Sequence, residues 1–345
     1  MNKEKPHFRV DSSILKDTGC FRKYYLKGYL GYSSDRTEQS LAFGSAAHVF
    51  IEQYLLERSK RGGGPLEEIE IAKCTGAALK YYTESNYLPD YNKKYQDLSY
   101  LNKVCMEFDN TYSNSEPWKS EMTLVESPVT GLPFVEKNFS LPYYESEYCK
   151  ISLTGTMDTL YKLRGKGIYI VNDWKTTTAR DEQEFYRSFE LSHQLLTYYF
   201  ALSLFADSKE LNPELSTLYK DVVYETGVGF TISPIFMKGA TVPPRLERSP
   251  IMFFDKEDLE EYKIGLDIFC GKIDYYCVQK KALEEIVEFP LPFREGLHNG
   301  ACVGAYGKLC SYFGACKSNL KGRDLQYYLD NHFTKRGYNP LLFRK

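Results

Sequence analysis

Three charged residues in two neighbouring β-rich segments have types and spacing that suit a metal-dependent reaction. The segments ISLTGTMDTLYKL (151–163) and IYIVNDWKTT (168–177) are joined by the glycine-containing stretch RGKG, a pattern typical of a β-hairpin. Asp173 and Lys175 are two positions apart in the second segment. Successive side chains of a strand alternate between faces, so both should project from one face and Trp174 from the other.

The expected turn brings a second carboxylate opposite the first. With Gly165 and Lys166 as a two-residue turn, Asp158 pairs directly with Asp173. Like charges directly opposite each other destabilise a hairpin, so this register predicts a cation between them. Carboxylate oxygens suit Mg²⁺ or Mn²⁺, and Lys175 beside the ion would hold an attacking water and stabilise developing negative charge. The alternative is that Asp-x-Lys is a solvated strand edge, a pattern that occurs often by chance.

The remaining pattern predicts the elements that position these groups. We expect helices at 15–30, 41–58, 67–86, 97–113, 182–205 and 256–285, and strands at 122–126, 134–141 and 221–235. The sequence contains no internal repeat and no regular alternation of strand and helix. The predicted fold class is α/β or α+β, with a central mixed sheet, largely an antiparallel meander, flanked by helices and carrying a helical insertion at 61–120.

The composition is that of a globular protein with a sizeable core. Of 345 residues, 43% are hydrophobic and 26% charged, and no linker rich in Pro, Gly or Ser divides them, so we expect one domain over 1–345. No apolar run resembles a signal peptide or a membrane span. We therefore expect a cytoplasmic protein with reduced thiols and no membrane partner.

Charge gives a mixed indication about nucleic acid. The net charge is -2, whereas nucleic-acid binders usually carry a basic excess. Residues 317–345, however, contain seven Lys or Arg against two Asp, with aromatic residues interleaved. This end of the chain is either a tail that follows a nucleic-acid backbone or a solvated basic terminus.

The motifs together resemble the PD-(D/E)XK nuclease superfamily, and within it the RecB-like branch that includes AddB nuclease domains, CRISPR-associated adaptation nucleases and related phage enzymes. GTMD resembles the first acidic motif, with Asp158, and NDWKT the second, with Asp173 and Lys175. The resemblance implies a restriction-endonuclease-like fold. It also implies that Asp158, Asp173 and the Trp174 carbonyl bind the metal.

Two helical motifs extend the resemblance. GSAAH matches a G-x-x-x-H pattern, which implies that His48 is a metal ligand or lies beside one, although a single helical histidine is usually a packed or solvated residue. HQLLTYY contains Q-x-x-x-Y, so Gln194 and Tyr198 lie one helical turn apart on one face. The resemblance places these two near the DNA and the active centre.

Four cysteines resemble the iron-sulfur motif of some members of this branch. Cys20 lies near the N-terminus, and Cys302, Cys310 and Cys316 lie near the C-terminus, which implies a [4Fe-4S] cluster that joins residues 300–320 to the first helix. The spacing C-x7-C-x5-C departs from the more frequent C-x2-C-x5-C and puts one ligand in doubt. A zinc site and buried cysteines without metal remain alternatives.

These features predict a Mg²⁺- or Mn²⁺-dependent deoxyribonuclease, specifically an exonuclease acting on DNA ends or single strands in recombination, repair or replication. A helicase or recombination protein is the expected partner, and the host cytoplasm the location if a phage encodes the chain. Arg22, Tyr24 and Tyr25 are further candidates for strand contact. The alternatives are a non-catalytic DNA-binding or scaffold subunit and a zinc-stabilised interaction module.

Overall fold

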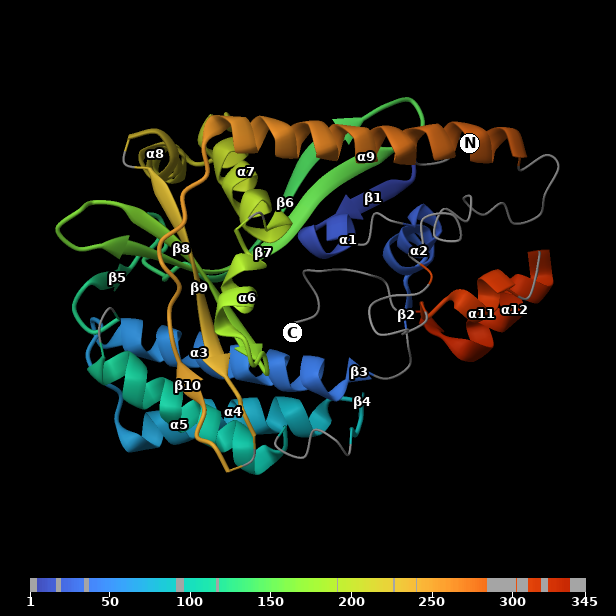
Figure 1. Ribbon diagram of the computed structural model, residues 1–345. Helices are drawn as coiled ribbons and strands as arrows, with labels where there is room; N and C mark the ends of the chain where they lie inside the picture. Colours follow the sequence, from blue (N-terminus) through green and yellow to red (C-terminus); the bar gives the residue numbers. More distant parts are fainter. Residues whose placement is uncertain are drawn as a thin grey trace.

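The chain forms a central β-sheet between two layers of helices (Figure 1). The computed structural model describes residues 5–16, 20–33, 37–90, 96–115, 118–190, 192–225, 227–239, 241–283, 302, 310–317 and 322–335. No helix in these ranges combines the length and apolarity needed to cross a bilayer.

The sheet has seven strands and is mixed, as predicted. Its main path runs β1-β7-β8-β9-β10, and β5 and β6 also pair with β7. The pairs β1–β7 and β8–β9 are parallel, whereas β5, β6 and β8 run antiparallel to β7. The strands are β1 His7–Val10, β5 Met122–Leu124, β6 Val135–Glu145, β7 Lys150–Leu163, β8 Tyr169–Thr177, β9 Val228–Phe236 and β10 Arg245–Leu246.

Each face of the sheet is covered by its own helices and its own hydrophobic core. On one face α7 (His193–Asp207) contacts β6 and β7, and α9 (Lys256–Leu283) and α8 (Pro213–Lys220) pack on or beside α7. On the other face α3 (Gln39–Lys60) contacts β6 and β8, with α4 (Glu68–Glu84) and α5 (Leu98–Asn114) against it. The predicted insertion at 61–120 therefore contains α4 and α5, which complete the second core.

A smaller assembly joins segments from the two ends of the chain (Figure 1). The strand β2 (Tyr32–Ser33) pairs antiparallel with β11 (Thr334–Lys335), and the Tyr32 hydroxyl donates to Asp330 Oδ1 at 2.7 Å. The helices α11 (Phe313–Lys317) and α12 (Gly322–His332) contribute to a third hydrophobic cluster with residues of the N-terminal segment. The basic residues at 318–321 and 336–345 lie outside the described residues.

The predicted N-terminal helix is interrupted. The structure has α1 (Ser12–Lys16), α2 (Phe21–Tyr24) and a π-helical turn (Tyr25–Tyr29) in place of one helix over 15–30. Cys20 has extended backbone angles, φ -151° and ψ 100°, and a residue in that conformation cannot belong to a continuous helix. Two short strands, β3 (Thr37–Glu38) and β4 (Tyr87–Leu88), form a separate parallel pair.

Two further predictions differ from the structure. The helix expected at 182–205 is split into α6 (Glu182–Arg187) and α7, because Ser192 caps α7 by accepting from the Gln194 N–H at 3.3 Å. Residues Asp221–Glu225 are π-helical, and β9 begins only at Val228. The connection from β8 through α6, α7 and α8 to β9 is a parallel crossover, so the expectation of a largely antiparallel meander was wrong at this point.

Candidate metal centre

The β7–β8 hairpin has the predicted register. Thr159 pairs with Asn172 and Lys162 with Tyr169, so the next position of the ladder sets Asp158 opposite Asp173. The turn is longer than predicted, because Leu163 N donates to Ile168 O at 2.8 Å and encloses residues 164–167. The two-residue turn was wrong, but the centre of the loop, and with it the register, is the same.

The two strands separate at the paired aspartates. The β7–β8 ladder ends at Thr159 and Asn172, whereas β8 continues to Thr177 beside β9. Asp158 lies at the branch point, where its Oδ2 accepts from the backbone N–H of Trp174 at 2.8 Å. A carboxylate therefore replaces a ladder carbonyl there, and the fork between β7 and β8 opens around Asp158 and Asp173.

The helix α3 delivers His48 to this fork. Small residues let the helix approach the sheet, since a Cβ built on Gly44 would lie 3.0 Å from Thr176 Oγ1 of β8, and Ala47 is buried. His48 follows one turn after Gly44. Its Nδ1 lies 3.6 Å from Asp158 Oδ2, which agrees with the position that the G-x-x-x-H resemblance implied.

A third acidic residue, Glu136 of β6, completes the group and was not predicted. The neighbouring pairs Val135–Thr159 and Lys137–Met157 place it opposite Asp158. Glu136 has φ 47°, a left-handed backbone conformation that is rare outside glycine, and its Oε1 lies 3.1 Å from His48 Nδ1. The sequence gives no hint of this placement, because a left-handed residue interrupts the alternation of β6.

These donors fit a divalent cation. One ligand atom from each of His48, Glu136 and Asp158 lies within 4.8 Å of the others. The side chains of the three are only 12%, 5% and 4% exposed. One imidazole nitrogen with carboxylate oxygens is a donor set that suits Mn²⁺, and carboxylates with water suit Mg²⁺.

Asp173 is held by a second set of side chains. Gln194 Nε2 donates to its Oδ1 at 2.9 Å and to the Tyr198 hydroxyl at 2.7 Å, and that hydroxyl lies 3.4 Å from Oδ1. Lys175 forms an ion pair with Oδ2. Gln194 and Tyr198 thus lie beside the acidic pair, on one face of α7 as their spacing predicted, and fix the orientation of the Asp173 carboxylate.

The buried charges are strongly coupled. Burial, and then the charge of Asp173, raise the pKa of Asp158 well above its usual value, while Lys175 and the Trp174 N–H act in the opposite direction. Burial lowers the pKa of Lys175, but the charges of Asp173 and Asp158 outweigh it and leave that pKa raised. Burial and the same two aspartates raise the pKa of Tyr198, which therefore stays a neutral phenol.

Three other predicted residues have different outcomes. The Trp174 side chain lies in the second core, and its backbone N–H donates to Asp158 Oδ2. Metal binding by the Trp174 carbonyl remains a prediction. Tyr24 and Tyr25 are each 2% exposed and pack in the first core. Their predicted contact with a DNA strand was wrong, because neither ring reaches the surface.

The four cysteines of the proposed cluster lie near one another. Burial, and then the charges of Cys20, Cys310 and Cys316, raise the pKa of Cys302. Cys310 N donates to Cys302 O at 2.9 Å. The fold thus brings Cys20, from before α2, to the C-terminal trio, and whether the four bind a metal remains a prediction.

The comparison with protein families agrees with this geometry. The family model of the PD-(D/E)XK nuclease superfamily matches residues 14–252, a range that contains every residue of the fork and excludes the three C-terminal cysteines. No curated protein matches the chain. Because the match covers well over half of the sequence and the fold has the expected mixed sheet, the chain belongs to the PD-(D/E)XK nuclease superfamily of metal-dependent nucleases.

Proposed function

We propose that this protein is a Mg²⁺- or Mn²⁺-dependent deoxyribonuclease that acts as an exonuclease. The observation that carries the proposal is the convergence of His48, Glu136 and Asp158 within 4.8 Å at a fork that also holds the Asp173–Lys175 ion pair. A cation at this position offsets the repulsion between two buried carboxylates. The same position lets a phosphodiester approach Lys175, which is partly exposed at 27%.

Each side chain has a separate task in the proposed hydrolysis. His48, Glu136, Asp158 and Asp173 would hold the cation, with the Trp174 carbonyl as a further ligand. A bound divalent ion would activate water and neutralise charge on the phosphate. Lys175 orients the attacking water and stabilises the charge that develops on phosphate oxygens. Gln194 and Tyr198 keep the Asp173 carboxylate in place, as partners of a ligand commonly do.

The finer assignment rests on the resemblance to the RecB-like branch. The ordered motifs GSAAH, GTMD, NDWKT and HQLLTYY support it. By analogy with that branch, we propose that the protein acts on DNA ends or single strands, in recombination, repair or replication, beside a helicase or recombination protein. We propose the cytoplasm as its location, or the host cytoplasm if the chain is encoded by a phage.

We also propose that Cys20, Cys302, Cys310 and Cys316 hold a [4Fe-4S] cluster. The proximity of the four thiols supports this, as does the assembly of β2 and β11 beside them. A cluster there would fasten the two ends of the chain. Anaerobic purification should give a brown protein with about four iron and four sulfide per chain, and a colourless protein with about one zinc per chain would overturn the assignment.

The mode of cleavage is tested with end-labelled linear DNA and covalently closed circles, each incubated with anaerobically purified protein and Mg²⁺. An exonuclease degrades the linear DNA and leaves the circles intact. Cutting of the circles would show an endonuclease instead. Binding of DNA without hydrolysis in either metal would contradict the proposed activity and indicate a scaffold subunit.

A further inference from the structure

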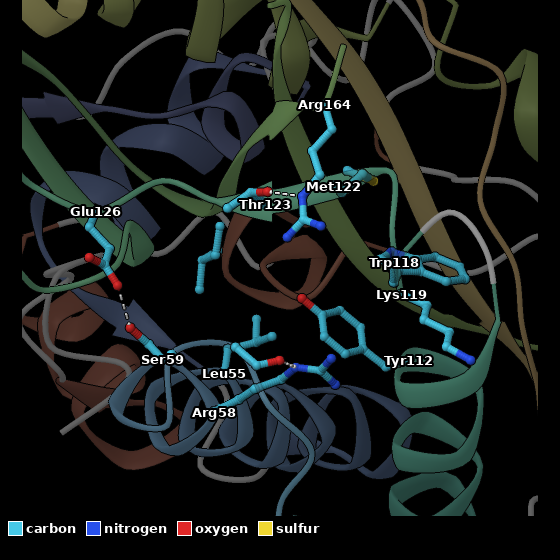
Figure 2. Close-up of a pocket in the computed structure, with 13 residues that line it drawn as sticks. Leu55, Arg58, Ser59, Tyr112, Trp118, Lys119, Met122, Thr123, Glu126 and Arg164 are labelled. Carbon is cyan, nitrogen blue, oxygen red and sulfur yellow. Dashed lines mark hydrogen bonds between the residues drawn. The ribbon is translucent and has the colours of Figure 1, made fainter.

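A second site with opposite charge lies at the closed end of the β7–β8 hairpin. A pocket of about 300 Å³ lies between α3, α5, β5 and the hairpin turn, and Figure 2 shows the residues that line it. Its volume is at the lower end of the range for small-ligand sites. Three cations line it, Arg58, Lys119 and Arg164, together with the single carboxylate of Glu126.

The two arginines are held in place by hydrogen bonds, and Arg164 keeps donors available. Arg164 Nε donates to Thr123 Oγ1 at 2.7 Å, and Arg58 donates to Gly63 O at 2.9 Å and Ser113 Oγ at 3.1 Å. None of the three cations forms an ion pair within the described part of the chain. Both terminal nitrogens of Arg164 therefore remain available to a planar or tetrahedral oxyanion, which is the ligand that guanidinium groups bind best.

Trp118 contributes a buried hydrogen-bond donor to the wall of the pocket. It lines the pocket, is only 4% exposed, and its indole nitrogen has no hydrogen-bond partner among the described residues. A buried donor without an acceptor costs free energy, about 1–3 kcal/mol. The ring packs against Tyr112 and Trp174, with centroids 6.3 and 6.2 Å away, so the indole offers no open face to a base.

The site is well separated from the metal centre. Arg164 follows Asp158 by six positions along β7 and its turn, which corresponds to about 20 Å at the rise of a strand. That length equals about six base-pair steps of duplex DNA. A strand engaged at the metal centre can therefore present a distant phosphate here, whereas a mononucleotide substrate at the centre cannot.

We infer that the pocket lined by Arg58, Lys119, Arg164 and Trp118 binds a phosphate group of the DNA substrate, away from the scissile bond. This inference rests on the proposed nuclease function for the identity of the strand, whereas the preference for phosphate rests on the pocket alone. The contact positions the backbone and reads no base. A free nucleotide offers the same chemistry and is distinguished by experiment.

The test uses the full-length double variant R164Q/K119Q, because Arg58 also packs over the Tyr112 ring at 4.9 Å. The matched control is Lys166→Gln, which removes one charge from the same turn but does not line the pocket. Binding of a 30-nucleotide single strand is measured in EDTA between 50 and 200 mM salt. We expect the double variant to bind about 5- to 20-fold more weakly. The slope of the logarithm of the binding constant against the logarithm of the salt concentration should be shallower by about one to two.

Two further measurements identify the source of the phosphate. Titration with deoxyadenosine monophosphate shows whether a free nucleotide displaces DNA from the wild type but not from R164Q/K119Q. Displacement assigns the pocket to nucleotides, and no displacement with weakened DNA binding assigns it to the strand. If R164Q/K119Q and Lys166→Gln bind the 30-nucleotide strand equally well, and also bind deoxyadenosine monophosphate equally well, the proposal of a phosphate pocket would be overturned.

Hydrolysis of thymidine 5′-(p-nitrophenyl phosphate) separates this inference from the proposed function. The substrate is too short to span both sites, so R164Q/K119Q should retain the wild-type kcat on it. A wild type that hydrolyses no substrate while its DNA binding depends on Arg164 and Lys119 would refute the nuclease and leave the phosphate pocket standing. A wild type that hydrolyses DNA while the double variant binds it equally well would refute the pocket alone.

Discussion

At the open end of the β7–β8 hairpin, the structure buries Asp158 and Asp173 against one lysine, whereas at the closed end Arg58 and Arg164 face a cavity with a single carboxylate. The open end has an excess of buried negative charge that a bound cation would offset. The closed end has an excess of positive charge that suits an anion. The same two strands thus separate the proposed metal site from the proposed phosphate site by about 20 Å.

Removing the lysine that neutralises the acidic end should have the largest effect. Lys175→Ala leaves the Asp158–Asp173 pair without its neutralising partner and removes the group that faces the phosphate. We expect kcat on linear DNA to fall about 10²- to 10⁴-fold, with little change in DNA affinity. Lys166→Ala in the turn is the control and should be unchanged, so equal kcat values for the two variants would remove Lys175 from the mechanism.

Glu136→Gln tests whether the acidic end includes the residue that the sequence did not reveal. The substitution keeps the shape of the side chain and removes its charge beside His48. We expect Mn²⁺ affinity, measured by calorimetry, to fall about 10- to 100-fold, with activity recovered at high Mn²⁺. Glu126→Gln is the same change at the basic end and should leave Mn²⁺ affinity intact. Identical affinities for all three proteins would exclude Glu136 as a ligand.

Asp158→Asn tests the cost of the buried acidic pair in metal-free protein. The folded-state pKa of Asp158 is raised, so ionising it destabilises the native state, and this penalty grows as pH rises from about 4 through the raised value. In EDTA at neutral pH the variant should unfold at a higher denaturant concentration than the wild type. Its free energy of unfolding should be higher by about 1 kcal/mol or more. The advantage should vanish near pH 4, and a variant less stable than wild type at pH 7 would contradict the coupling.

Glu126→Gln should have the smallest effect, and it should strengthen DNA binding, whereas R164Q/K119Q should weaken it. Removing the one carboxylate of the basic pocket should tighten binding of the 30-nucleotide strand by about two- to threefold at low salt, as expected for an exposed charge. The gain should disappear at high salt through screening. Weaker binding by this variant would show that Glu126 positions Ser59 or a neighbour instead of opposing the phosphate.

The acidic end could be predicted largely from the sequence, because its information is local. The alternation of a strand fixes Asp173 and Lys175 on one face, and the centre of a glycine-containing turn fixes Asp158 opposite them, even though the turn is longer than expected. His48 required the family resemblance, since its position depends on how closely α3 packs at Gly44. The role of Glu136 was not predicted, because its left-handed backbone interrupts the alternation of side chains from which the faces of a strand are predicted.

The basic pocket could not be predicted from the sequence, because no single segment of the chain contains the residues that line it. Arg58, Trp118 and Arg164 come from a helix, a turn and a hairpin loop far apart in the sequence, and only tertiary packing brings them together. The parallel pairing of β8 with β9 was not predicted for a similar reason. It depends on the crossover through α6, α7 and α8, whereas the sequence reports mainly on individual elements.

The most direct test of the metal centre is the rate of DNA hydrolysis as a function of Mn²⁺ concentration, for the wild type and for Asp158→Asn. The wild type should show hydrolysis that saturates with Mn²⁺. The variant should fold, bind DNA and show no metal-dependent hydrolysis, because it lacks the carboxylate at the branch point of the hairpin. Saturable Mn²⁺-dependent hydrolysis by Asp158→Asn at the wild-type rate would contradict a catalytic centre at the β7–β8 fork.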